Sequence, residues 1–474
     1  MSRWKLLAGA VAAAVAVGAL VPASALAHGL VGRADLPVPG WLFGWAAAIV
    51  LIVSFVALAT LWPRPRLQEP VRHELFRLPS AVVGACGLIG VALFALVVYA
   101  GFEGTKEATQ NLAPNLIYVH FWVGFVVVSV LFGDVFRAFN PWLAVGRAGA
   151  WVAGRLSRGR LRAPLAYPES WGRWPAALGV LGFAWLELCY VNKADPGILA
   201  ELSLGYFGFQ LVAMSLFGVE TWSRRGDAFG VLFNLYSRLS PFERREGTVY
   251  ARVPLSGAPP YPLLPGTVAL LAVAIGTTTF DGLSNGPVWA SINPHLQSFF
   301  GDLGAGLSGR VELSATIGLL SCVLLVGAFY LLGVRGMESA GEGHQARELA
   351  GRFVHTLIPI AFAYALAHYF SLLIYQGQSV RFLVSDPLGD GSNFFGTANA
   401  TIDYGIISGS GIWYVQVGAL VCGHVAGLVL AHDRAVALYR SGRDAVRSQY
   451  WMLVVMVGFT SLGLWLLSAV NGTG

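Results

Sequence analysis

The chain alternates long apolar stretches with short arginine-bearing connections, and this alternation limits the folds that are open to it. Of its 474 residues, 56% are hydrophobic and only 12% are charged, against roughly 25% charged residues in ordinary soluble domains. Apolar stretches long enough to cross about 30 Å of hydrocarbon predict transmembrane helices. We therefore expect an all-α fold, a polytopic bundle of about ten helices in contact with the lipid bilayer. The ten stretches are Trp41–Trp62, Ser80–Gly101, Leu116–Arg137, Pro175–Val191, Leu199–Trp222, Pro265–Phe280, Leu313–Val334, Phe353–Tyr375, Ile412–Ala431 and Tyr450–Val470.

The first 27 residues have the pattern of a secretory signal peptide. Arg3 and Lys5 give a positive start, an apolar segment follows, and Ala25-Leu26-Ala27 forms a small-x-small cleavage site. Cleavage there would leave residues 28–474 as a single helical membrane domain that begins at His28. The alternative is an uncleaved first helix.

The basic residues predict how the chain crosses the membrane. If the mature N-terminus lies outside, 24 of the 31 Lys and Arg residues fall in inner segments and only five in outer ones, the other two being in the signal peptide. Positive residues accumulate in cytoplasmic loops, so we expect a multi-pass plasma-membrane protein with both mature termini outside. The net charge of +6 then reports topology and does not indicate a nucleic-acid partner.

Two outer segments, residues 282–312 and 376–411, are too long to be simple turns. Loops of this length are usually functional or disordered.

A short sequence pattern also occurs twice in the chain. Gly133-Asp134-Val135-Phe136 resembles Gly226-Asp227-Ala228-Phe229, and a Phe-Asn pair follows each of them. Each copy follows a helix that runs from outside to inside, as an internal duplication would require, but so short a match also arises by chance.

Ionisable groups at membrane depth are costly and mark functional sites. His120, Glu187 and His368 all fall in the outer halves of their predicted helices, and Tyr364 shares a helix face with His368. We expect Glu187, His368 and Tyr364 to act as catalytic residues in a pocket that opens to the outer face. The alternative is a network of hydrogen bonds that joins the helices.

The same side chains suggest a metal site. His120, His368 and Glu187 are the residue types that hold a hydrolytic divalent metal such as zinc. The free amine and ring of an N-terminal His28 would suit copper. The four cysteines lie in separate apolar stretches without close spacing, so neither a disulfide framework nor a cysteine zinc site is expected.

Five blocks of sequence carry a resemblance to known proteins: residues 28–33, 132–137 with 139–142, 183–188, 277–282, and 358–364 with 367–369. Together they resemble a family of bacterial multi-pass membrane proteins named fenitrothion hydrolase. The resemblance covers nearly the whole mature chain and implies hydrolysis of a phosphotriester-like small molecule by a membrane-bound enzyme with two kinds of subunit. Other functions stay open: a membrane transporter, a copper-handling protein, or a non-catalytic subunit that anchors a second subunit or lipoprotein.

Overall fold

The computed structural model describes residues 40–158, 163–340 and 342–471. The predicted signal peptide and His28 lie outside these residues. Helices account for most of the described chain, because long apolar segments in lipid must satisfy their backbone hydrogen bonds internally. The helices are α2 (Gly40–Leu61), α3 (Ser80–Glu103), α4 (Leu112–Asn115), η1 (Leu116–Gly124), α5 (Phe125–Phe132), α6 (Phe136–Phe139), α7 (Pro141–Leu156), α8 (Trp174–Leu188), α9 (Pro196–Phe217), α10 (Val219–Arg225), α11 (Ala228–Tyr236), α12 (Thr267–Ser284), α13 (Pro287–Asp302), α14 (Leu307–Met337), α15 (Ala346–Phe353), α16 (Leu357–Tyr375), α17 (Val380–Leu383), α18 (Gly409–Leu438) and α19 (Gly442–Asn471).

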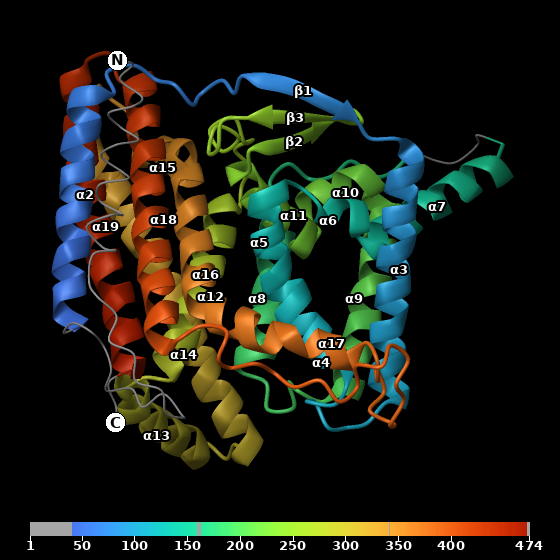
Figure 1. Cartoon of the computed structure of the whole chain (residues 1–474). Helices are drawn as coiled ribbons and strands as arrows, with labels where there is room; N and C mark the ends of the chain where they lie inside the picture. Colours follow the sequence, from blue (N-terminus) through green and yellow to red (C-terminus); the bar gives the residue numbers. More distant parts are fainter. Residues whose placement is uncertain (1–39, 159–162, 341, 472–474) are drawn as a thin grey trace.

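The long helices form two groups that lie side by side (Figure 1). One group contains α2, α12, α14, α16, α18 and α19, and the other contains α3, η1 with α5, α8 and α9. The packing of α12 against α8 joins the two groups. Within the first group α16 and α18 approach closely, since a Cβ on Gly423 would lie only 2.2 Å from Ala363 Cβ. Small residues at helix crossings are typical of packing in membranes.

The prediction of a multi-pass membrane protein is confirmed. Eight helical segments among the described residues are long and apolar enough to span a bilayer. A ninth predicted span corresponds to α8, which has only 15 residues, and the tenth corresponds to α19, which has 30 residues. Helices therefore occupy all ten predicted positions, with boundaries that move by several residues.

The all-α expectation is confirmed, with one small addition, a three-stranded sheet at one end of the bundle. Strands β1 (Arg72–Arg77), β2 (Phe242–Arg245) and β3 (Thr248–Arg252) pair antiparallel in the order β1-β3-β2. The β2–β3 turn places Glu246 and Gly247 at φ values of 49° and 85°, the left-handed conformation of a tight hairpin. These segments were expected to be basic loops. We call this end of the bundle the sheet end, and the opposite end, which carries α13 and α17, the α13 end (Figure 1).

The two long segments that were expected to be outer loops both lie at the α13 end. Residues 282–312 contain α13, which packs against α14 and buries Trp289 beside Phe280. Residues 376–411 contain a short 3₁₀ turn, α17 and a series of turns. Both segments therefore cover the end of the bundle at which the predicted site residues lie.

Candidate functional site

His368 and Asp281 form the centre of a polar cluster between the two groups of helices. His368 Nε2 donates a hydrogen bond to Asp281 Oδ2 at 2.8 Å. The histidine comes from the second half of α16 and the aspartate from the last turns of α12. The side chains are 22% and 18% exposed, so both keep some accessible surface.

Glu187 adds a second carboxyl group to this cluster. Its side chain on α8 interacts electrostatically with Asp281 and with Lys193, which lies in the connection to α9. Trp122 and Tyr369 also face the Glu187 carboxyl group. Glu187 Oε2, Trp122 Nε1 and Tyr369 OH are buried, and although these groups lie close enough to interact, none of the three atoms forms a hydrogen bond of close geometry with a described residue. Buried polar atoms without partners are costly and often mark a functional site.

The helix that supplies Trp122 has an unusual backbone. Residues Leu116–Gly124 form a π-helix, and at its end the Phe125 amide donates to the carbonyl of His120, five residues earlier. A π-helical segment is rare and frequently lies at a functional site. Here it carries Tyr118 and Trp122 toward Glu187. The Tyr118 hydroxyl group also donates to the Lys193 carbonyl at 2.7 Å, which fixes the connection that holds Lys193.

The structure brings together two of the predicted site residues, Glu187 and His368, and places the others elsewhere. The His120 ring lies against the backbone of Asn115 and Gly377. The Tyr364 hydroxyl group donates to the Phe459 carbonyl on α19 at 2.9 Å, which is an interhelical contact. The predicted shared face of α16 therefore contacts several different elements along its length.

No group of three or more His, Cys, Asp or Glu side chains within the described residues is arranged to hold a metal ion. The predicted set of His120, Glu187 and His368 is thus not assembled as a metal centre. His28, the candidate copper ligand, lies outside the described residues. What the structure does assemble is a histidine with two carboxyl groups, and such a set can exchange protons with a bound molecule.

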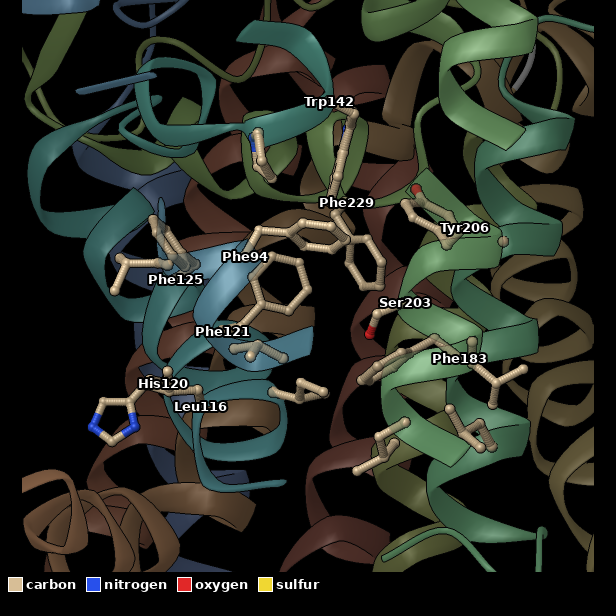
Figure 2. A pocket seen from close by; sticks show the side chains of 18 of the residues that line it. Phe94, Leu116, His120, Phe121, Phe125, Trp142, Phe183, Ser203, Tyr206 and Phe229 are labelled. Atoms are coloured by element: carbon tan, nitrogen blue, oxygen red, sulfur yellow. The ribbon is translucent and has the colours of Figure 1, made fainter. Parts of the chain in front are cut away.

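A large cavity lies beside this cluster, within the second group of helices. It has a volume of about 860 Å³ and is lined by residues of α3, η1, α5, α8 and α9, with α6, α7 and α11 at the sheet end. Figure 2 shows phenylalanine side chains from several helices converging on it, while the His120 ring turns away. Trp122 connects the two features, since its ring lies 4.7 Å from the ring of Phe183, which lines the cavity.

Sequence reasoning did not assign Asp281, Trp122 or Tyr369 to the site. Its position could have identified Asp281 as a candidate site residue, because it is a carboxyl group at the end of an apolar stretch. Nothing in the sequence distinguished Trp122 and Tyr369, since aromatic residues are common throughout these helices. Only the packing of four helices, η1, α8, α12 and α16, shows that these side chains meet.

The chain was compared with protein-family models, with curated proteins and with solved structures. No family model matches the chain, and neither a curated protein nor a solved structure is significantly similar to it.

Proposed function

We propose that the protein is a membrane-embedded hydrolase that cleaves an uncharged, phosphotriester-like ester at the His368–Asp281–Glu187 cluster. The observation that carries this proposal is the 2.8 Å hydrogen bond between His368 and Asp281, with both side chains partly exposed. A histidine oriented by a carboxylate is a recurring general base in hydrolytic enzymes. The resemblance to fenitrothion hydrolases supports the class of substrate.

The hydrogen bond assigns the roles of the two histidine nitrogens. A carboxylate only accepts hydrogen bonds, so Nε2 donates to Asp281 and the Nδ1 lone pair remains to take a proton. In the proposed step, His368 Nδ1 removes a proton from a water molecule while the water oxygen attacks phosphorus. The bond from phosphorus to the leaving oxygen breaks, and a phosphodiester and an alcohol or phenol result.

The neighbouring groups would assist this step. Glu187 lies beside Asp281, and paired carboxyl groups often divide the roles of base and acid; Glu187 would supply a proton to the leaving oxygen. Trp122 and Tyr369 hold N–H and O–H donors that face the Glu187 carboxyl group without forming a hydrogen bond of close geometry. Donors aimed at a developing negative charge lower the barrier to reaction, and these two would stabilise the phosphoryl oxygen.

The charge of the cluster predicts which esters are cleaved. With Glu187 protonated, Asp281 is the charged carboxyl group of the cluster, and its negative charge repels an anion; Lys193 interacts with both carboxyl groups. We expect membranes containing the protein to release p-nitrophenol from the uncharged triester diethyl p-nitrophenyl phosphate. The anionic diester bis(p-nitrophenyl) phosphate should not be cleaved. Equal release from membranes with and without the protein would contradict the proposal.

We also propose that the protein lies in the plasma membrane with its sheet end in the cytoplasm. The sheet carries a concentration of arginines, among them Arg72, Arg77, Arg244, Arg245 and Arg252, as the positive-inside rule predicts for a cytoplasmic end. The hydrolytic cluster would then face the outside, beneath α13 and α17.

This orientation predicts the outcome of a fusion experiment. A reporter that is active only in the cytoplasm should be silent when it is fused after Gly474, and active when it is inserted at the β2–β3 turn. The second fusion serves as the matched control for expression. A strong signal from the C-terminal fusion would mean that the number of crossings is not the predicted one.

A further inference from the structure

Two parts of the chain share a sequence pattern at matching places in the fold. Residues 133–140 are Gly-Asp-Val-Phe-Arg-Ala-Phe-Asn, and residues 226–234 are Gly-Asp-Ala-Phe-Gly-Val-Leu-Phe-Asn. An earlier helix in each part carries a second shared pattern, Gly-Val-x-x-Phe, at residues 90–94 of α3 and residues 179–183 of α8. The two patterns occur in the same order in both parts. This order favours an internal duplication over a chance match.

The structure supplies independent support for the duplication, because the two copies exchange hydrogen bonds. Asn234 Nδ2 donates to Asp134 Oδ2 at 2.6 Å. Asn140 Nδ2 donates to Asp227 Oδ2 at 3.0 Å. The asparagine of each copy therefore binds the aspartate of the other. A reciprocal exchange of this kind is expected of two repeats related by an approximate two-fold axis.

The cavity of about 860 Å³ lies between these two copies. Ligand sites in duplicated membrane proteins are typically found at the interface between repeats. Here the shared patterns supply matched pairs of lining residues, one from each copy. The pairs are Gly90 with Gly179, Phe94 with Phe183, and Phe136 with Phe229.

Gly90 and Gly179 allow close packing in the wall of the cavity. A Cβ on Gly90 would lie 1.9 Å from the Phe139 carbonyl oxygen, and a Cβ on Gly179 would lie 2.7 Å from Ala228 Cβ. Each glycine thus lets its helix approach the segment of the same copy that begins with Gly-Asp-x-Phe, residues 133–140 or 226–234. Both approaches bring a phenylalanine of that segment to the cavity, as Figure 2 shows for Phe229.

The chemistry of the lining indicates what the cavity accepts. Eleven of its 26 lining residues are aromatic, and only His120 and Glu201 among them can carry a charge. The His120 ring turns away from the cavity in Figure 2. At the sheet end, Trp142 Nε1 and Tyr206 OH already donate to Asp227, at 2.7 and 2.9 Å. These groups have no donor left for a ligand.

Ser203 is a polar lining residue that can orient a bound molecule. The Ser203 side chain on α9 faces the cavity (Figure 2). No hydrogen bond of its hydroxyl group to another described residue is found. It can therefore donate to an oxygen of a ligand. A cavity of this volume is within the range of about 300–1,000 Å³ that is usual for small-molecule sites.

We infer that this cavity between the repeats binds an uncharged aromatic molecule dissolved in the lipid, and that Ser203 donates a hydrogen bond to its oxygen. The inference is independent of the proposed hydrolysis, because His368, Asp281 and Glu187 do not line the cavity. It assigns the protein a second site, at membrane depth.

Photolabelling with benzophenone tests this inference. Benzophenone is an uncharged aromatic ketone, and 4-benzoylbenzoate has the same photochemistry with a negative charge. The protein in lipid nanodiscs is irradiated with each compound, and the labelled residues are mapped by mass spectrometry. We expect benzophenone to label cavity residues such as Leu93, Leu186 and Leu202 with saturation, and 4-benzoylbenzoate to leave them unlabelled.

A matched pair of variants on α9 completes the experiment. Ser203→Phe fills the cavity and should raise the half-saturating concentration about tenfold, equivalent to roughly 1.4 kcal/mol. Val212 lies on the exposed face of the same helix, so Val212→Phe should leave labelling unchanged. Labelling without saturation, equal labelling by the anion, or full labelling of folded Ser203→Phe would overturn the inference. If Ser203→Phe does not fold, the comparison of the two compounds on the unaltered protein decides.

Discussion

Replacing His368 with alanine is expected to lower the turnover number for an uncharged phosphotriester by about 10²–10⁴-fold, the usual contribution of a general base. The substitution removes the Nδ1 lone pair that would accept the proton of the attacking water. Asp281→Asn should cause a loss of similar direction, since an amide no longer holds the ring with Nε2 as the donor. The measurement is p-nitrophenol release per folded molecule, with folding verified by melting temperature in detergent.

Tyr375→Phe provides the matched control on the same helix. The Tyr375 hydroxyl group donates to the Ile407 carbonyl at 3.0 Å, a contact with the segment at the α13 end. Interhelical hydrogen bonds in membranes average only about 0.6 kcal/mol, so this variant should lose a little stability and keep its turnover. If folded His368→Ala and folded Tyr375→Phe hydrolyse the triester equally well, the cluster is not catalytic. Its hydrogen bond would then only join α12 to α16.

Replacing Asp227 with alanine is expected to lower the free energy of unfolding by about 3–5 kcal/mol, because several buried neutral donors lose their acceptor at a cost of roughly 1–3 kcal/mol each. Asp227 is fully buried and accepts hydrogen bonds from Asn140, Trp142 and Tyr206. Burial raises the pKa of this carboxyl group, while these donors act to lower it. Alanine would leave three donors unpaired, and unsatisfied buried donors carry the full cost of their desolvation.

The duplicated aspartate gives the control for this prediction. Asp134 occupies the same position in the other repeat, but it is only half-buried and accepts from Asn234. Asp134→Ala should therefore cost far less. Unfolding of both variants by increasing sodium dodecyl sulfate in mixed micelles would give the comparison. Equal losses would contradict the view that Asp227 is the main polar anchor between the repeats.

The sequence by itself determined the helical class of the protein and the places of its helices. Runs of apolar residues long enough to cross the bilayer leave the backbone no other way to satisfy its hydrogen bonds. This is why helices occur at each of the ten predicted positions. The cost of charge at membrane depth also singled out Glu187 and His368.

Only the tertiary structure decided which of these residues meet. The partner of His368 is Asp281, 87 positions away, and helical periodicity within one segment contains no information about the rotation of another. The same limit explains the sheet, because the residues of β1 pair with residues of β3 that lie 171 to 180 positions later. It also explains the exchanged bonds of Asp134 and Asp227. The repeated pattern in the sequence supported duplication only once the structure placed the aspartate of each copy against the asparagine of the other.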